Sequence, residues 1–354
     1  MPSKPNIIYI VPSLKRCGPT NQLLMIVDAA TRHFEVEVLI LKEIEQTNSM
    51  AHLFAELGVK VTTLNSTAIN CRFKIAKHLL NSSPKLIHSH GFLPELMLAT
   101  LRLTAPWLSS IRNYSWEDYP MKFGRFIGSL MALAHIWALG KANYCVFCSN
   151  YLKTKYSRHN IDARVIRNGV RLPLIRHHKD STDKTNRHIS VVGSLIKRKN
   201  NMPLVLAHND FSLSNKTKLF FIGDGPEIVT LQSIAGKNIT FVGQVNDVGA
   251  WYSESKLFIS NSLSEGMPNS VLEALSHGVR CLLSRIEPHS ELASEFPRLV
   301  SFIEPQDDPQ AISKKMLDLV NLEEPKNVAC DLHKISHALM ANKYLDLYRE
   351  IISS

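Results

Sequence analysis

The segment 256–284 constrains the fold most, because it has the pattern of a βαβ unit. Two short apolar runs, 256–260 and 279–284, have the length and composition of buried strands. Between them, a turn containing Gly266 leads into a helical stretch that Gly278 ends, since glycine tolerates the positive φ of the position after a helix. Two strands joined by a helix belong to a parallel sheet, and such sheets bind ligands at the carboxyl ends of their strands.

The same alternation runs along the whole chain of 354 residues, which is too long for one ordinary core. The expected strands are 6–11, 35–41, 59–64, 86–89, 107–112, 144–148, 189–193, 217–222, 239–242, 256–260, 279–284 and 300–303. The expected helices include 20–33, 48–57, 71–82, 92–104, 121–139, 150–157 and 332–352. A polar, basic linker at 171–187 separates two series, so we predict an α/β fold with two Rossmann-like doubly wound domains, 1–170 and 188–337, facing each other across a cleft.

The net charge of +10 is concentrated in the first half of the chain. Residues 1–180 hold 23 Lys and Arg against 11 Asp and Glu, whereas residues 181–354 hold 18 against 20. A basic half favours an anionic partner. Nucleic acid is disfavoured, because no helix-turn-helix, zinc-finger or aromatic RNA-binding signature accompanies the charge. An anionic membrane surface is the better candidate.

One apolar stretch in this basic half, 126–140, contains no Lys, Arg, Asp or Glu. It is too short to cross a bilayer. With Lys122, Arg125 and Lys141 beside it, it has the composition of a helix that lies in the headgroup plane with Trp137 near the interface. An ordinary buried helix explains the stretch equally well, so both interpretations stay open.

The six cysteines show no disulfide spacing. Cys145 and Cys148 form a C-x-x-C pair inside the apolar run 144–148, without the second ligand pair or exposed helix start that zinc or redox chemistry needs. We predict that they are core strand residues in a reducing cytoplasm. The strand 6–11 begins almost at once, with no signal peptide before it, so we expect a cytoplasmic protein.

Two carboxylates, Glu265 and Glu273, are separated by seven residues around an expected helix start at Asn269. A helix N-terminus attracts anions such as phosphate, whereas a carboxylate is suited to accepting hydrogen bonds from hydroxyl groups. A nucleotide sugar offers both partners at once. A lone Glu is usually a solvated surface residue, but the surrounding turn and strands favour a binding site.

Further candidates follow other strands of the second half. The loop after the strand 189–193 carries Lys197, Arg198 and Lys199, which suit a diphosphate, although a solvated charged face has the same composition. Gly223 follows the next strand and allows the backbone to approach a ligand closely, but a simple turn explains it equally well.

In the first half, Gly18 lies in the loop after the first strand, which lacks the G-x-G-x-x-G spacing of a dinucleotide site. His88 and His90 close the fourth strand, and we expect one of them to point into the cleft because strand residues alternate faces. Arg112 and Asn113 begin an aromatic and polar loop that suits sugar recognition, as many surface loops do. The candidate acceptor-binding residues are Arg112, Asn113 and Asn21.

Together these segments resemble the retaining GT-B glycosyltransferases of glycosyltransferase family 4, in particular the bacterial surface-polysaccharide enzymes. The resemblance covers nearly the whole chain and is most specific at 265–273, which is similar to the family's E-x7-E motif. It implies that the last helix, at about 338–354, packs back onto the first domain. It also implies catalysis without a metal or other cofactor, and the sequence has no D-x-D motif.

The resemblance implies roles for the matching residues. Glu265 and the backbone of the loop after it would bind the donor sugar and phosphates, and Glu273 the ribose. His90 matches a histidine near the reacting sugar. Lys199 matches the lysine of a diphosphate segment in which Ser194 replaces the usual arginine, with Lys197 or Arg198 compensating. The implied donor-binding residues are Glu273, Lys199, Gly266, Met267, Pro268, Asn269, Gly18, Arg198 and Gly223.

The implied reaction transfers a sugar from a nucleotide diphosphate sugar, UDP-sugar favoured and GDP-sugar possible, with retention at the anomeric carbon. The acceptor would be a lipid-linked oligosaccharide of O-antigen, lipopolysaccharide or capsule synthesis, at the inner face of the bacterial cytoplasmic membrane. The departing phosphate would deprotonate the acceptor while Glu265 positions the donor and His90 steadies the charge. Two alternatives are a sugar-nucleotide epimerase of the same architecture and a non-catalytic sugar-binding protein.

Overall fold

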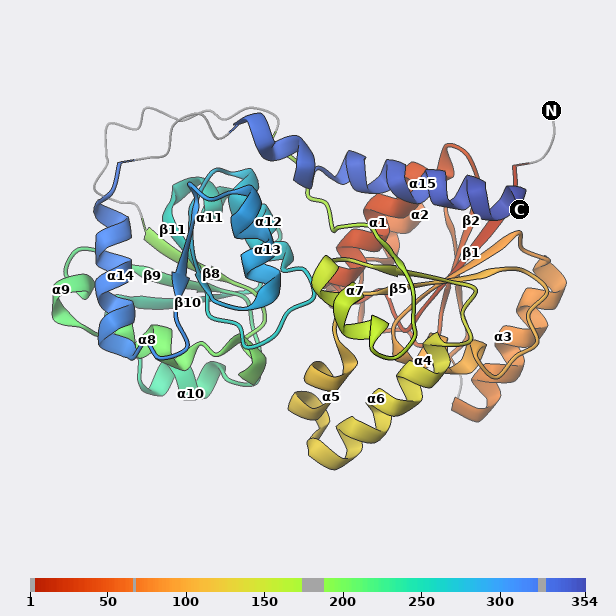
Figure 1. Cartoon of the computed structure of the whole chain (residues 1–354), viewed down its shortest axis with the longest axis horizontal. Helices are drawn as coiled ribbons and strands as arrows, with labels where there is room; N and C mark the ends of the chain where they lie inside the picture. The colour runs from red at the N-terminus through yellow and green to blue at the C-terminus, as the bar shows by residue number, and fades with distance from the viewer. Residues whose placement is uncertain (1–3, 66–67, 174–187, 324–328) are drawn as a thin grey trace. The chain divides into compact units, whose positions relative to one another are not determined.

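The structure is a computed structural model that describes residues 4–65, 68–173, 188–323 and 329–354. The chain forms two compact units (Figure 1). Unit 1 consists of Met1–Gly169 together with His337–Ser354, and unit 2 consists of Val170–Ser336. Most of the expected linker, from 174 to 187, lies outside the described residues.

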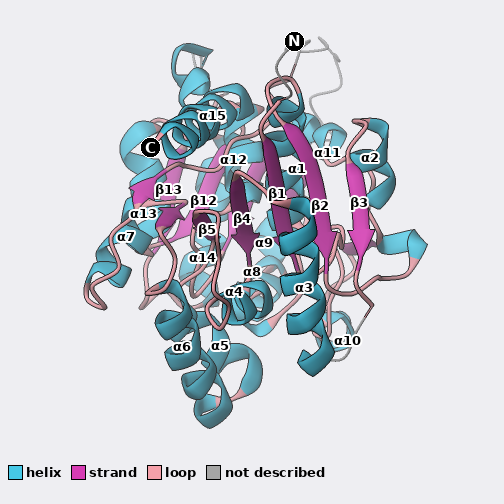
Figure 2. Ribbon diagram, turned by 90° about the vertical axis from the view of Figure 1, so that its right-hand side faces the viewer, coloured by secondary structure: helices cyan, strands magenta, loops and turns pink. Residues whose placement is uncertain are grey.

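Unit 1 is built on a parallel seven-stranded sheet in the order β3-β2-β1-β4-β5-β6-β7. Figure 2 shows the first five of these strands side by side. Its strands are β1 (Asn6–Val11), β2 (Glu35–Ile40), β3 (Lys60–Thr63), β4 (Leu86–His90), β5 (Trp107–Ile111), β6 (Tyr144–Phe147) and β7 (Arg164–Val165). Successive residues of β1 enter two different cores, Tyr9 on one face and Ile8 on the other. Both faces of the sheet are therefore covered, which explains why the central strands are continuous apolar runs.

The helices of unit 1 connect these strands and cover the two faces. They are α1 (Gly18–Thr31), α2 (Ala51–Glu56), α3 (Ala68–Ser82), α4 (Phe92–Leu98), α5 (Ser115–Phe123), α6 (Arg125–Leu139), α7 (Asn150–Ser157) and α15 (His337–Ser353), with a 3-10 turn η1 (Gln46–Asn48).

The last helix of the chain, α15, completes the core of unit 1 with two buried tyrosines. The Tyr348 hydroxyl lies 3.1 Å from the Tyr9 hydroxyl and 2.8 Å from His88 Nδ1. Ser110 Oγ lies 2.8 Å from His88 Nε2 and 2.9 Å from the Tyr344 hydroxyl. These buried contacts join α15 to β1, β4 and β5, which lie far from it in the sequence.

Unit 2 contains a parallel six-stranded sheet in the order β10-β9-β8-β11-β12-β13. Its strands are β8 (His188–Val192), β9 (Leu219–Ile222), β10 (Ile239–Gly243), β11 (Ser255–Ser260), β12 (Arg280–Ser284) and β13 (Val300–Ile303). Its helices are α8 (Met202–His208), α9 (Phe211–Ser214), α10 (Ile228–Ser233), α11 (Gly249–Glu254), α12 (Asn269–Ser276), α13 (Glu287–Glu295) and α14 (Pro309–Asn321), with 3-10 turns η3 (Lys197–Lys199) and η4 (Ala329–Ile335).

The predicted α/β class with two parallel sheets is confirmed, and every expected strand occurs within two residues of its predicted bounds. Three expected helices are wrong. The helix expected at 121–139 is two helices, because Gly124 interrupts it with a φ of +82°. The helix expected at 332–352 begins only at His337, and the one expected at 92–104 ends at Leu98.

Candidate functional site

The candidate site lies in unit 2, in the loop that leaves the carboxyl end of β11. β11 pairs in parallel with β12, and α12 connects them, beginning at Asn269. Gly278 follows α12 with a φ of +70°, so the predicted βαβ unit is confirmed. A pocket beside this loop is lined by Gly193, Ser194 and Lys199, which follow the neighbouring strand β8.

The carboxylate of Glu265 is buried and is held by two cations of the loop after β8. Its Oε1 accepts a hydrogen bond from Lys199 Nζ at 2.6 Å, and its Oε2 lies 2.8 Å from Arg198 Nη1. Burial alone would raise the pKa of this carboxyl, but the charges of Lys199 and Arg198 outweigh burial and hold the pKa well below its usual range. Glu265 is therefore ionised, and the three side chains together carry one net positive charge.

Further contacts fix the loop after β8 against the loop after β11. The Leu263 N–H donates to the Arg198 carbonyl at 2.8 Å, and the Arg198 guanidinium donates to the Ser264 carbonyl. The third cation of this loop, Lys197, is exposed. The structure thus separates two cations that face the site loop from one that faces solvent.

Glu273 lies half-buried on α12, the helix that follows the loop containing Glu265. Its Oε2 accepts a hydrogen bond from the Tyr252 hydroxyl of α11 at 3.1 Å. Burial raises the pKa of Glu273 to about 7, although the hydrogen bond from Tyr252 lowers it. A ligand hydroxyl that donates to this carboxylate would favour its charged form.

Gly223 has a role within the protein itself. Its φ is +140°, and a Cβ at this position would lie 2.1 Å from the Gly193 carbonyl oxygen. The glycine is needed for the loops after β8 and β9 to approach each other. A contact between Gly223 and a donor stays a prediction.

His289 of α13 is a buried residue that the sequence analysis missed. Its Nδ1 lies 2.8 Å from the Ser284 carbonyl oxygen and donates to it, while Nε2 has no hydrogen-bond partner among the described residues. Burial lowers the pKa of His289 to about 4, against the opposing effects of the Ser284 hydrogen bond and the Glu265 charge. A neutral imidazole that senses the charge of Glu265 is a further candidate for this site. The available signal was its place just after the strand 279–284.

In unit 1, His90 ends β4 and its ring centroid lies 4.4 Å from that of His88. Residues two apart on a strand share a face, so the alternation of strand residues does not separate the two histidines. That one of them points into the cleft stays a prediction. Both nitrogens of His88 are occupied by Tyr348 and Ser110, whereas neither nitrogen of His90 has a hydrogen-bond partner in the described part of the chain. Burial and then the charges of His88 and Arg112 hold the pKa of His90 well below its usual range, so its ring is neutral.

The structure brings one of the three acceptor candidates to His90. Arg112 lies close enough for its charge to lower the pKa of His90. Asn21 is exposed on α1, which Gly18 begins, and Asn113 is half-buried in the loop after β5. Within the described part of the chain, no hydrogen bond joins the side chain of Asn21 or Asn113 to His90.

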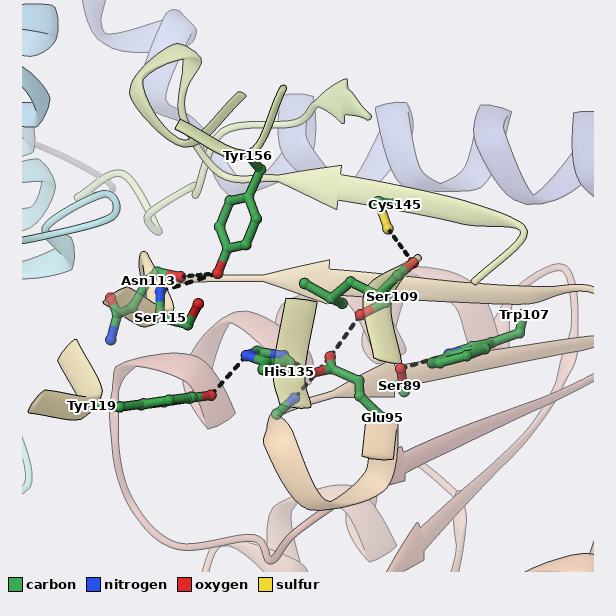
Figure 3. A network of polar contacts seen from close by, with 12 residues as sticks. Ser89, Glu95, Trp107, Ser109, Asn113, Ser115, Tyr119, His135, Cys145 and Tyr156 are labelled. Carbon is green, nitrogen blue, oxygen red and sulfur yellow. Dashed lines mark hydrogen bonds and ion pairs between the residues drawn. The ribbon is translucent and has the colours of Figure 1, made fainter. Parts of the chain in front are cut away.

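A second buried carboxylate, also missed from the sequence, lies beside the residue that follows β4 (Figure 3). Glu95 of α4 is 1% exposed and accepts hydrogen bonds from the Gly91 N–H at 3.1 Å and the Ser109 hydroxyl at 2.6 Å. Its other oxygen contacts His135 Nε2 of α6, and His135 Nδ1 lies 2.8 Å from the Tyr119 hydroxyl of α5. This network ties α4, α5 and α6 to the end of β4. Its signal was a single acid in the apolar stretch 92–98.

Part of unit 2 matches a known protein family in sequence, and the whole chain is similar to known proteins. Residues 186–321 match the family described as "Glycosyl transferases group 1". Unit 2 therefore carries a group 1 glycosyltransferase domain. Over 366 residues the chain is 23% identical to the O-antigen biosynthesis glycosyltransferase WclY of Escherichia coli, with 98% of each chain covered. It is 25% identical over 232 residues to the putative teichuronic acid biosynthesis glycosyltransferase TuaC of Bacillus subtilis, which covers 61% of this chain and 57% of that one.

The fold of the whole chain has solved counterparts. Anabaena HepE, crystallised with UDP and glucose, has a TM-score of 0.80 at 12% sequence identity, covering 96% of this chain and 98% of HepE. This similarity, together with the two parallel sheets, confirms the predicted GT-B fold.

The structure also bears on the cysteines, on membrane-spanning helices and on metal sites. Cys145 and Cys148 are buried free thiols, so their predicted place in the core is confirmed, and burial raises the pKa of Cys145 to about 12. Within the described ranges, no helix is both long and apolar enough to cross a bilayer. In the same ranges, no group of three or more His, Cys, Asp and Glu side chains is arranged as metal ligands.

Proposed function

We propose that the protein is a retaining glycosyltransferase of family 4 that transfers a sugar from a nucleotide diphosphate sugar to a lipid-linked oligosaccharide. UDP-sugar is the favoured donor and GDP-sugar the second candidate. The acceptor hydroxyl would belong to a growing bacterial surface polysaccharide, namely O-antigen, lipopolysaccharide or capsule. The observation that carries the proposal is the buried Glu265 carboxylate held by Lys199 and Arg198 beside the start of α12.

The chemistry of this cluster supports a diphosphate donor. Lys199 and Arg198 supply positive charge near a helix N-terminus, where backbone N–H groups also favour phosphate. Glu265, in the loop before α12, is an ionised acceptor for donor hydroxyl groups, and Glu273 of α12 is suited to the ribose hydroxyls. We assign to the backbone of 266–269 the remaining contacts with the donor.

The proposed reaction needs no external base. The bond between the anomeric carbon and the phosphate oxygen breaks, and the nucleoside diphosphate leaves with that electron pair. The acceptor oxygen bonds to the same face of the sugar, and its proton passes to the departing phosphate. Lys199 and Arg198 stabilise the charge that grows on the phosphate, the role that a metal fulfils in other enzymes. The neutral His90 would accept or donate a hydrogen bond at the transferred sugar.

The proposal extends to the place of action. The acceptor's lipid tail and the basic residues of 1–180 support work at the inner, cytoplasmic face of an anionic membrane, with the protein bound peripherally.

The test is a thermal-shift panel of nucleotides and nucleotide sugars, followed by turnover of the best ligand. A ligand that binds only the folded protein raises its melting temperature, so we expect UDP or GDP and the matching sugar nucleotide to do so. Transfer to a lipid-linked acceptor with the donor's anomeric configuration, read by NMR of the product, would establish the reaction. Isomerisation of the donor without acceptor would show an epimerase, and binding without any turnover would show a sugar-binding protein.

A further inference from the structure

The helix α6 exposes most of its large apolar residues and buries several small ones, although Leu139 near its end is buried. Its inward residues include Gly128, Ala132 and Ala138. Phe126 is 78% exposed, and Trp137 is 48% exposed. These exposed apolar residues, together with one from the end of α5, are called here the docking face: Phe123, Phe126, Ile127, Leu130, Leu133 and Trp137. Exposed apolar surfaces of this kind mark sites of interaction with proteins or membranes.

Contacts within unit 1 fix which side of α6 faces inward. A Cβ at Gly128 would lie 2.4 Å from the backbone nitrogen of Pro120, so α5 and α6 are in backbone contact. His135 anchors α6 from its buried side to Glu95 and to Tyr119. α5 and α6 lie side by side and project beyond the sheet of unit 1 (Figures 1 and 2). The docking face is therefore held outward by specific contacts.

Charged residues at the ends of α6 decide which partner fits. α6 contains no Asp or Glu. Exposed cations lie at both ends of the helix: Lys122 near the end of α5 and Arg125 at the first position of α6, and Lys141 just after α6. A second copy of the same face would bring like charges together. A lipid surface offers anionic headgroups around hydrocarbon, which matches a cationic rim around an apolar centre.

We propose that the docking face binds an anionic lipid bilayer, with α6 lying in the headgroup plane. α6 has 15 residues and is too short to cross the hydrocarbon. Its apolar side chains enter the boundary between headgroups and acyl chains, and the cations at its ends contact the anionic headgroups. The proposal deepens the proposed function by naming the surface that meets the membrane, and rests on that function only for the purpose of docking.

The experiment measures co-sedimentation of the full chain with vesicles at low salt. Wild-type protein is expected to bind vesicles containing phosphatidylglycerol more tightly than phosphatidylcholine vesicles, and to lose affinity as salt rises. Phe126→Ser is expected to weaken binding about tenfold or more. Its matched control is Phe73→Ser, which removes an exposed Phe of α3 that is 66% exposed, and this change should leave binding unaltered.

Two double variants test the contribution of the cations near the docking face. The double variant Lys122→Gln with Arg125→Gln should bind anionic vesicles about fivefold more weakly for each cation removed. Lys77→Gln with Lys85→Gln removes two exposed cations elsewhere on unit 1 and should have a much smaller effect. An equal loss in both pairs would show general attraction of a basic protein and overturn the docking face.

A spectroscopic readout tests the depth of insertion directly. Trp137 fluorescence, isolated as the difference between wild type and Trp137→Phe, should be quenched by vesicles with brominated acyl chains. Absence of quenching overturns the in-plane position of α6, whether or not the protein sediments with vesicles.

The outcomes separate this proposal from the proposed function. Failure to bind anionic vesicles, with UDP still raising the melting temperature, overturns the docking face alone. If the protein binds vesicles but no nucleotide raises its melting temperature, the result supports the docking face and contradicts the proposed glycosyltransferase function. If the protein does not bind vesicles but self-associates, and Phe126→Ser abolishes the self-association, the docking face binds a second copy of the chain. That result overturns the proposal.

Discussion

Glu265 illustrates how one carboxylate limits the positive charge of the site at which we propose that a diphosphate binds. Without it, Lys199 and Arg198 would present two cations to any phosphate. With it, the cluster keeps one net positive charge, and both cations have fixed positions. A site of this kind can bind a diphosphate and release it, because part of the attraction is already balanced.

Glu265→Gln separates binding from turnover. The change raises the net charge of the cluster by one, so the affinity for UDP should be unchanged or higher. Transfer should fall about 10²- to 10³-fold, the usual cost of losing one preorganised polar group at a reacting centre. Calorimetry with UDP and product formation measure the two effects. The exposed Glu254→Gln is the matched control, and normal transfer in Glu265→Gln would remove Glu265 from the mechanism.

Glu273 makes the stability of the protein depend on pH. Its pKa rises from 4.5 to about 7 on folding, so between these values the folded protein binds more protons than the unfolded chain. The stability that this proton provides is present below pH 4.5 and is lost as the pH rises to about 7. Because Glu273→Gln removes the titration, the variant should gain about 1–3 kcal/mol of unfolding free energy relative to wild type between pH 5 and pH 8.

Urea unfolding of both proteins at the two pH values measures this difference. Glu254→Gln serves again as the surface control, with no comparable change expected between the two pH values. A gap between Glu273→Gln and wild type that is equal at pH 5 and pH 8 would contradict the prediction.

At the scale of elements, every expected strand was found, whereas three of the expected helices had the wrong bounds. A buried parallel strand is a short apolar run between turns, which a sequence shows directly. The break between α5 and α6 depends on the backbone of Gly124, and an apolar pattern that runs on past a glycine does not reveal it. The contact of Glu265 with Lys199 joins residues 66 positions apart. No local pattern predicts that Arg198 and Lys199 face Glu265 while Lys197 faces solvent.

Gly128→Ala tests the close packing of α5 on α6. The new Cβ would overlap the backbone near Pro120, so the two helices must move apart, at a cost of about 1–3 kcal/mol. Gly140→Ala is the matched control at the end of the same helix, where the nearest atoms lie 3.5 Å away and φ is −65°. Thermal unfolding should therefore show a loss for the first variant and a change within about 0.5 kcal/mol for the second. Equal melting temperatures for Gly128→Ala and wild type would show that the helices separate without cost.

At the scale of the whole molecule, the two ends of the chain fold together. α15 places Tyr344 and Tyr348 in the core of unit 1, where their hydroxyls satisfy Ser110, His88 and Tyr9. A chain that ends before α15 therefore removes the partners of the Tyr9 hydroxyl and of His88 Nδ1, leaves Ser110 with His88 alone, and exposes an apolar core. Unit 2 has its own core, which includes no residue of α15.

A chain ending at Ser336 should consequently lose structure in one unit only. We expect its amides in β1 and β4 to lose protection from hydrogen exchange, while those in β8 and β11 keep it. A chain ending at Ile352, which keeps all but the last residue of α15, is the control and should exchange like wild type. Loss of protection in β8 and β11 as well would mean that unit 2 depends on unit 1 for its stability.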